Sequence, residues 1–416
     1  MRATLNRVSL VTEIDVPHLP PDPRYFTHLH SFNTQISRVI FHEATHYWQQ
    51  LSQTFMLMVA AEDWGRLQRF RDGGDAEAAG PLNSILRRPH PNFGYSANDL
   101  AESASRYWDI LNVGPHNLVE SDLATGVVMD DETRDLYDRA SFAGLFRSSD
   151  DGFSQLTVEI AMRISGGSYA LPYLNLLAKL GDRYDPQAMA LFPLLAHWAL
   201  QTPEPVIFYE RFAELAGRKV ARWSKWQHRL GRLMGRRVLF RDLEKMQDLY
   251  YLQLSPLMSK AVTKAGYKMY TGGEFLRYST QRIHTIQAGS KSITVMNMPT
   301  YDSLAGHPVY AWASRWQEEF GRAAMREGRG DDLRNLFRNP DDSATLVADR
   351  LLALPGGPEG RALLIEYLQP PIHRFSDDRT WFTGVDPNND NNLAIAQECM
   401  AIHNAWEEFR KVRRGY

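Results

Sequence analysis

The stretch Phe41-His42-Glu43-Ala44-Thr45-His46 decides how the rest of this chain is interpreted. It holds two histidines four residues apart, with a glutamate directly after the first. The surrounding residues, from Thr34 to Ala61, include no glycine or proline. Apolar residues recur there at intervals of three and four, which predicts an α-helix over this range. Residues four apart lie on one face of a helix, so the two imidazoles can reach the same metal ion.

Glu43 lies about 100° around the predicted helix from His42. It can therefore sit beside a metal ion without binding it, and can hold a water molecule that the metal binds. Zinc suits this arrangement, because neutral histidine nitrogens bind the ion and a nearby carboxylate takes a proton from its water. The pattern predicts Zn²⁺ as the cofactor, His42 and His46 as ligands and Glu43 as the general base.

The motif His42-Glu43-x-x-His46 resembles that of the zincin metallopeptidases. A glutamate on a later helix, Glu102, resembles the layout of the gluzincin group within them. The resemblance implies that Glu102 is the third zinc ligand. Gluzincins commonly carry Ala and Asp three and four residues after that glutamate, whereas this chain carries Ser105 and Arg106.

Glu102 belongs to a helix predicted from Ala97 to Asn112, because Ser96 with Asp99 is typical of a helix start. Asp109, seven residues after Glu102, can hydrogen-bond a ligand imidazole from the same face. Glu159 is the alternative third ligand. It lies on a helix predicted from Gly152 to Ile164, among apolar neighbours, where an unpaired carboxylate is costly to bury.

Composition indicates a soluble, cytoplasmic protein. The 416 residues carry a formal net charge of −2, which gives no overall bias toward polyanions. The single cysteine, Cys399, excludes an intramolecular disulfide framework and fits a reducing compartment. The N-terminal residues lack the apolar core of a signal peptide. The longest apolar run, Phe55 to Ala61, is too short for an integral membrane segment.

The expected fold class is mainly α (α+β), with a zincin-like metal-binding helix, a small β-sheet and a large helical remainder. Residues 1–200 are predicted to form the metallopeptidase core and residues 201–416 a mostly helical region that completes the cleft, with a single domain as the alternative. Strand signals occur at residues 6–14 and 291–298. Residues 372–375 and 381–382 are expected in loop. The helices expected in the C-terminal third span residues 308–326, 343–354, 358–368 and 393–413.

One stretch is strongly basic. Residues 218–241 contain nine lysines or arginines and no acid. The basic residues Arg222, Lys225, Arg229, Arg232 and Arg236 recur at helical spacing beside Trp223, Trp226, Leu230 and Leu233, which predicts a helix with one basic and one apolar stripe. A solvated basic face explains this pattern, and a contact with a polyanion or an acidic protein is the alternative.

The leading functional hypothesis is a zinc metallopeptidase (hydrolase) that acts on an intracellular protein or peptide. A helical di-iron carboxylate protein is an alternative, since Glu43-x-x-His46 also fits its Glu-x-x-His motif. A second such motif is expected there, but Glu398 and His403 are five residues apart. A catalytically retired zincin that binds a partner through the basic helix is the third hypothesis. Substrate specificity, the oxyanion-stabilising group, any activator and the oligomeric state stay open.

Overall fold

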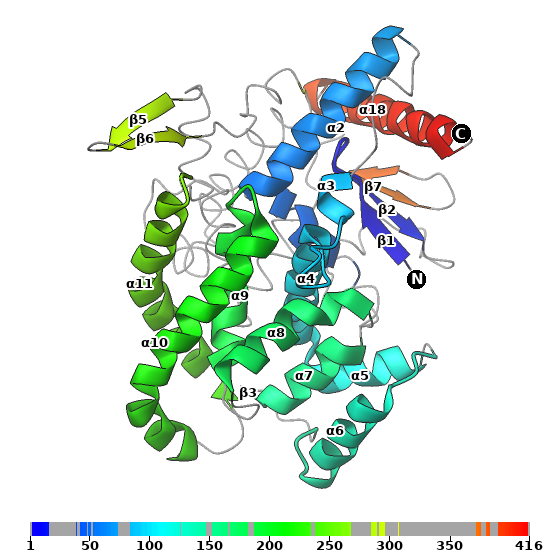
Figure 1. Cartoon of the computed structure of the whole chain (residues 1–416). Helices are drawn as coiled ribbons and strands as arrows, with labels where there is room; N and C mark the ends of the chain where they lie inside the picture. Colours follow the sequence, from blue (N-terminus) through cyan, green and yellow to red (C-terminus); the bar gives the residue numbers. More distant parts are fainter. Residues whose placement is uncertain are drawn as a thin grey trace. The chain divides into compact units, whose positions relative to one another are not determined.

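The protein is mainly α-helical, with small β-sheets, in the computed structural model (Figure 1). This confirms the expected mainly α (α+β) class. The structure describes residues 2–15, 39, 42–47, 49–50, 53–73, 84–124, 126–146, 152–164, 167–181, 187–233, 238–267, 284–288, 291–295, 307, 372–375, 380–382 and 390–414. The helices expected at residues 308–326, 343–354 and 358–368 lie outside these residues.

Contacts divide the chain into two compact units. The first unit combines residues 1–85, 270–349 and 359–416, so it joins both ends of the chain. The second unit comprises residues 86–269 and 350–358. Helices α9 (Gln187–Leu200) and α10 (Pro205–Leu233), which come before and after the expected boundary, contact each other within the second unit. The domain boundary expected between residues 200 and 201 stays a prediction.

A four-stranded sheet lies in the first unit, in the order β1-β2-β7-β8. Its strands are β1 (Arg2–Leu5), β2 (Val11–Asp15), β7 (Ile372–Phe375) and β8 (Thr380–Phe382). β2 pairs in parallel with β7, while the β1–β2 and β7–β8 pairs are antiparallel. The expectation of loop at 372–375 and 381–382 is therefore wrong. Pairing with a strand far away in the chain supplies partners that no local pattern in these short stretches reveals.

The predicted strand over residues 6–14 is in fact a turn followed by a strand. The side-chain oxygen of Asn6 accepts hydrogen bonds from the backbone N–H groups of Val8 (3.0 Å) and Ser9 (3.1 Å). Leu10 takes the left-handed conformation, with φ of 56°. An asparagine side chain that bonds its own downstream backbone favours a turn over a strand. Residues 2–15 consequently form a hairpin.

Two further helices of this unit are α2 (Thr54–Gly73) and α18 (Asp390–Arg414). They contact each other, and the rings of Phe70 and Phe409 lie with centroids 4.9 Å apart. The last expected helix, 393–413, is thus confirmed. A separate hairpin of β5 (His284–Ala288) and β6 (Lys291–Val295) confirms a strand within 291–298; residues 296–298 lie outside the described residues.

The helix that carries the histidine pair is shorter than predicted. Residues 42–47 and 49–50 are helical, Gln53 is not, and α2 begins at Thr54. The predicted helix therefore does not run unbroken to Ala61; the part before residue 39 lies outside the described residues. The side chain of Gln50 donates a hydrogen bond to the carbonyl of Met56 (2.6 Å) across the break. This bond spans a helix break for which the sequence contains no glycine or proline.

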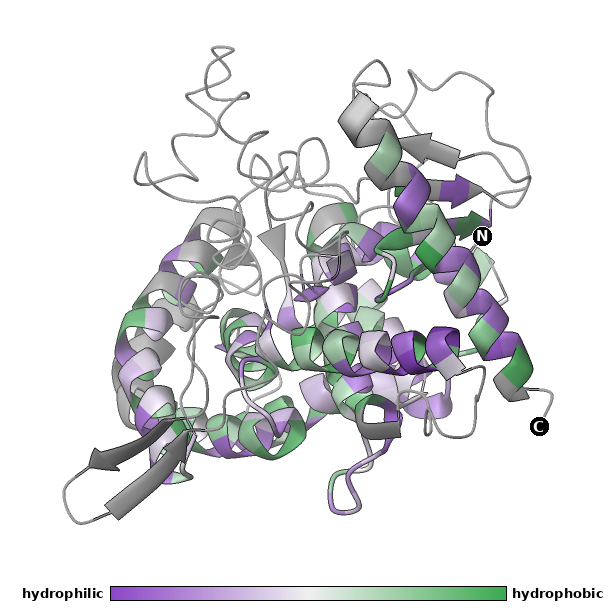
Figure 2. Cartoon of the chain, turned by 90° about the horizontal axis from the view of Figure 1, so that it is seen from above, coloured by the Kyte–Doolittle hydropathy of each residue, from purple (hydrophilic) through white to green (hydrophobic). Residues whose placement is uncertain are grey.

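The second unit is a helical assembly around α9 (Gln187–Leu200), every residue of which is buried. Helices α4, α7, α8, α10 and α11 all contact α9. In Figure 2 many of the described helices carry apolar and polar residues on the same element, as expected for helices that bury one face. The elements of this unit, with the preceding helix α3 (Ser84–Arg87), are α4 (Ala97–Val113), α5 (Pro115–Ala124), α6 (Asp131–Phe142), β3 (Gly152–Phe153), α7 (Gln155–Ile164), η2 (Gly167–Ala170), α8 (Leu171–Leu180), α10 (Pro205–Leu233), β4 (Val238–Leu239) and α11 (Phe240–Lys264).

Membrane insertion finds no support among the helices. Within the described ranges, none of them combines the length and the apolar character needed to cross a bilayer.

Candidate metal centre

The histidine pair takes the geometry that its spacing predicts. The Nε2 atoms of His42 and His46 lie 3.0 Å apart, and the two rings meet edge to face, with an interplanar angle of 82°. Two nitrogens bound to one zinc ion at about 2.0–2.1 Å and at a tetrahedral angle lie roughly 3.3 Å apart. The pair is therefore close to the separation that one ion requires, and both side chains are partly exposed.

Gln49 contacts the imidazole of His46 at Nδ1, the ring nitrogen that does not face His42. Its side-chain oxygen lies 2.9 Å from Nδ1 of His46, and Gln49 is buried. An amide oxygen can only accept, so the bond places the ring proton on Nδ1 and makes Nε2, which lies 3.0 Å from Nε2 of His42, the acceptor nitrogen of the ring. Metal-bound histidines are commonly oriented in this way by a partner on the far ring nitrogen. Sequence reasoning missed Gln49, although its position three residues after His46 on the helix was a usable signal.

Glu43 is buried although it belongs to a partly exposed motif, with 5% of its surface exposed. Its Oε2 atom accepts a hydrogen bond of 2.7 Å from the backbone N–H of Leu5, at the end of β1. A carboxylate that accepts a backbone hydrogen bond is stabilised in its charged form. One oxygen of Glu43 is thus committed to the hairpin. The sequence contains no sign of this contact.

The third predicted ligand, Glu102, lies on α4. This helix begins as expected: Ser96 caps it, and Asp99 completes the capping box with bonds in both directions. Glu102 belongs to the second unit, whereas His42 and His46 belong to the first. Its role as the third ligand stays a prediction. Two imidazoles and one carboxylate would form a donor set that fits zinc.

The alternative ligand, Glu159, is placed differently. It has no exposed surface, and its Oε1 atom accepts a hydrogen bond of 3.0 Å from Arg163 on the same helix. Arg163 also pairs with Glu132. This ion pair compensates the cost of burying the Glu159 carboxylate. Asp109 is buried on α4, and its proposed contact with a ligand imidazole stays a prediction.

The residues of the di-iron alternative lie elsewhere. His403 is on α18 with both ring nitrogens engaged, Nδ1 by Asn6 and Ser9 and Nε2 by Glu13. Glu398 is exposed. These contacts give no support for a second pair of metal ligands among the described residues.

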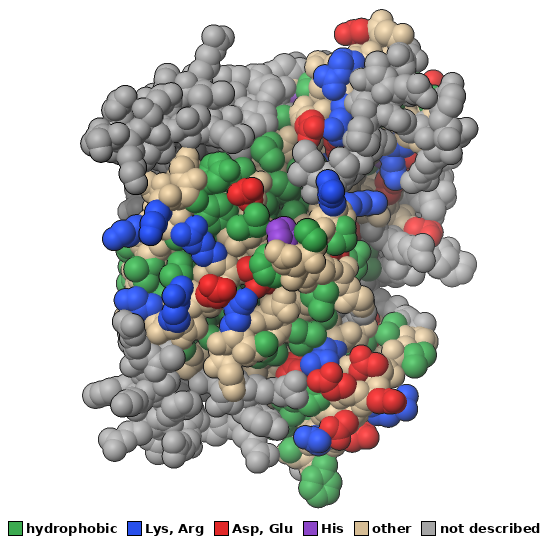
Figure 3. All heavy atoms as spheres, in the orientation of Figure 1, with side chains coloured by type: hydrophobic (Ala, Val, Ile, Leu, Met, Phe, Trp, Pro, Cys, Tyr) green, Lys and Arg blue, Asp and Glu red, His purple; other side chains and the backbone are tan. Residues whose placement is uncertain are grey.

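The basic stretch spans α10 and the start of α11, so its helical character is confirmed over most of its length. Its side chains from residue 221 to 241 lie outside the described ones. Figure 3 shows lysine and arginine side chains gathered over the region of α10 and α11, and acidic side chains over α6. The contact with a polyanion or an acidic protein stays a prediction.

Comparison with known proteins adds no relative to this geometry. The chain matches no protein-family model, no curated protein and no solved structure. The function is therefore inferred from the residues of the site.

Proposed function

We propose that this protein is a zinc-dependent metallopeptidase. The observation that carries the proposal is the pair of His42 and His46 Nε2 atoms 3.0 Å apart, with the buried carboxylate of Glu43 on the next residue. A structural zinc site has no use for a carboxylate beside its ligands, whereas a hydrolytic one does. We propose Glu102 as the third ligand because its place on a later helix resembles the layout of the gluzincins.

His42, His46 and Glu102 would hold the ion and leave its fourth position to water or substrate. Zinc bound there would lower the pKa of its water and polarise the carbonyl of the scissile bond. Glu43 would accept a proton from the attacking water and pass it to the amine that leaves. Gln49 would keep His46 in the tautomer that presents Nε2, and the Leu5 amide would keep the Glu43 carboxylate charged and oriented.

The substrate class follows from the resemblance of His42-Glu43-x-x-His46 to the zincin metallopeptidases and is part of the proposal. We propose an intracellular protein or peptide as the substrate. The single cysteine fits this compartment, because one cysteine cannot form an intramolecular disulfide framework.

Two measurements on the purified chain test the proposal. The metal content should be close to one zinc per chain, and the protein should cleave members of a diverse set of fluorescence-quenched peptides. Removal of zinc with a chelator should abolish cleavage, and added zinc should restore it. Bound zinc without cleavage of any peptide or protein tested would reject the peptidase. Paired iron would instead support the di-iron alternative, and no bound metal would support a binding protein.

A further inference from the structure

The end of strand β1 presents a backbone group to Glu43 rather than to the sheet. The N–H of Asn6 donates to the carbonyl of Val11 (2.9 Å), so these residues form a hydrogen-bonded pair of the hairpin. Such pairs alternate along an antiparallel ladder. Leu5, opposite Thr12, therefore points its N–H away from β2. Among the described strands β1 is at the edge of its sheet, and this outward N–H is the one that Glu43 accepts.

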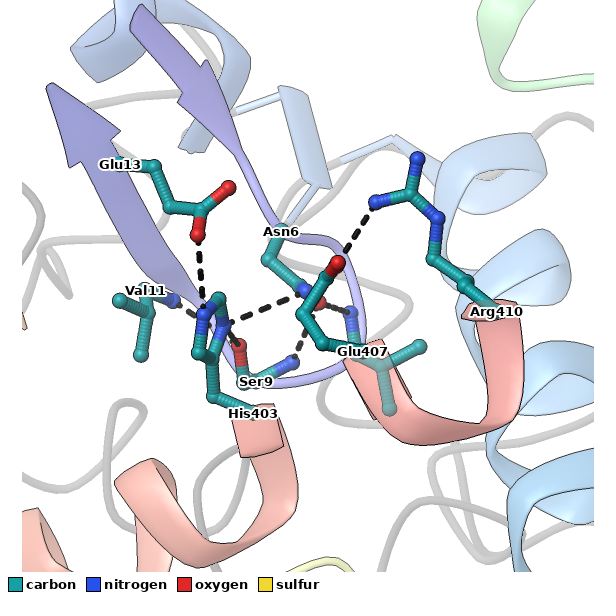
Figure 4. Close-up of polar contacts among 8 residues, drawn as sticks. Asn6, Ser9, Val11, Glu13, His403, Glu407 and Arg410 are labelled. Atoms are coloured by element: carbon teal, nitrogen blue, oxygen red, sulfur yellow. Dashed lines mark hydrogen bonds and ion pairs between the residues drawn. The ribbon is translucent and has the colours of Figure 1, made fainter. Parts of the chain in front are cut away.

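The turn that follows Leu5 is held by the C-terminal helix. Nδ1 of His403, on α18, lies 3.3 Å from the side-chain nitrogen of Asn6 and 3.2 Å from Oγ of Ser9. Nε2 of His403 lies 3.1 Å from the carboxylate of Glu13 on β2. Figure 4 shows the imidazole inserted between the turn and the strand. With the ring proton on Nε2, all three bonds are satisfied together, since Asn6 and Ser9 donate and Glu13 accepts.

A second buried histidine holds the same turn from another part of the chain. Nε2 of His307 lies 2.6 Å from the carbonyl oxygen of Val8 and donates to it. The His307 ring packs against Trp64 of α2, with centroids 4.2 Å apart. The turn between β1 and β2 is thus held by side chains from two segments that are distant in sequence, His403 and His307.

The order Ser9, His403, Glu13 is that of a hydrolase triad, but no substrate can reach it. Ser9 and His403 have no exposed surface. Ser9 also accepts a hydrogen bond from the backbone N–H of Val11 (3.4 Å) within the turn. The cluster is therefore a support for the hairpin and not a second reaction centre.

We propose that the amide of Leu5 positions the Glu43 carboxylate for its work as a base, and that His403 is a positioning residue which holds the hairpin presenting that amide. The inference rests on the proposed function for its catalytic consequence. Its structural part, a link from α18 through the hairpin to Glu43, stands on the hydrogen bonds alone.

The structural part is tested by hydrogen–deuterium exchange of the N-terminal peptide that contains Leu5, read by mass spectrometry. Glu43→Ala removes the acceptor and should speed exchange of the Leu5 amide. His403→Leu releases the turn and should speed exchange there too. Phe409→Leu is the matched control, because it weakens the contact of α18 with Phe70 without touching the hairpin network. Unchanged exchange in both Glu43→Ala and His403→Leu would overturn the link.

The catalytic part is tested by removing only the Leu5 N–H. Replacing Leu5 with its α-hydroxy-acid analogue does this without a change of shape. Leu5→Pro is the genetic equivalent, since this N–H is outside the sheet ladder and proline is tolerated at a sheet edge. Both should keep zinc content and KM and lower kcat by roughly 10- to 100-fold, the cost of a displaced reacting group. Leu5→Ala keeps the N–H, so its kcat should exceed that of Leu5→Pro.

The two failures are distinguishable. A parent protein without zinc or peptidase activity sinks the proposed function, while the exchange experiment still decides the link. Normal kcat in the hydroxy-acid and proline variants of an active parent would overturn the role of Leu5 and leave the peptidase standing.

Discussion

Oε1 of Gln49 lies 2.9 Å from Nδ1 of His46, one helical turn beyond the metal-binding motif. The opposite ring nitrogen, Nε2, faces His42 at 3.0 Å. The two contacts set the direction of the imidazole from both sides. In the proposed site Gln49 would prepare His46 to bind the metal ion, because the amide oxygen fixes the tautomer.

Gln49→Leu keeps the size of this buried side chain and removes the acceptor. We expect zinc affinity to fall by roughly 10- to 100-fold, the usual effect of losing such a partner. Competition with a chelator of known affinity measures it. Gln50→Leu is the matched control, since Gln50 is also buried but bonds the carbonyl of Met56. Equal zinc affinity in the two variants would show that Gln49 does not orient the ligand.

Substitution of the proposed base and substitution of a proposed ligand should have different effects on zinc content and on rate. Glu43→Gln keeps shape and removes the basic carboxylate. We expect it to retain about one zinc per chain and to lose roughly two to four orders of magnitude in rate, the contribution of general acid–base catalysis. His46→Ala should lose both zinc and activity, because the two ligands that remain hold the ion poorly. Full activity of Glu43→Gln would contradict the mechanism proposed above.

Substitutions of Glu102 and of Glu159, the two candidate third ligands, should have different effects on zinc binding. Glu102→Ala should bind zinc about as poorly as His46→Ala if it is the third ligand. Glu159→Gln breaks a buried ion pair with Arg163, so it should lower the melting temperature and leave zinc binding intact. Metal titration and thermal unfolding of both variants decide the matter. Normal zinc binding by Glu102→Ala would remove Glu102 from the site.

His307 should make stability depend on pH. Burial lowers the pKa of His307 to about 4 from 6.5, an effect larger than that of its bond to Val8, which raises it. Between these values the unfolded chain binds a proton that the folded chain does not, so stability is lost as pH falls. At pH 5 this titration lowers the free energy of unfolding by about 2 kcal/mol relative to neutral pH.

A phenylalanine at this position lacks the titration. His307→Phe should be less stable than the parent at pH 7.5, because Val8 loses its donor, and the gap should narrow by about 2 kcal/mol at pH 5. Burial raises the pKa of Asp63 to about 6, so protonation of Asp63 stabilises the folded protein as the pH falls. This effect is the same in the parent and the variant. The difference between their free energies of unfolding therefore cancels it. Denaturant unfolding at the two pH values measures the gap. A constant gap would mean that His307 does not titrate in this window.

Local rules predicted much of the fold and half of the site. Helical spacing brought His42 and His46 together, as the 3.0 Å contact shows, and the signal of Ser96 with Asp99 marked the start of α4. These features depend on residues within a turn or two of each other, so the backbone geometry of a helix suffices to predict them. Residues 6–10 failed as a strand because the side chain of Asn6 competes for the backbone.

The sequence by itself predicted the candidate ligand pair, the neighbouring candidate base and the helices that carry apolar faces, because each follows from a period shorter than two helical turns. Only the tertiary structure decided that Glu43 is held by Leu5, that β2 pairs with β7, and that His403 and His307 both serve one turn. Hydrogen bonds between distant segments depend on where the whole chain packs. No short pattern encodes that, since a buried donor takes whichever acceptor the fold brings within 3 Å or so.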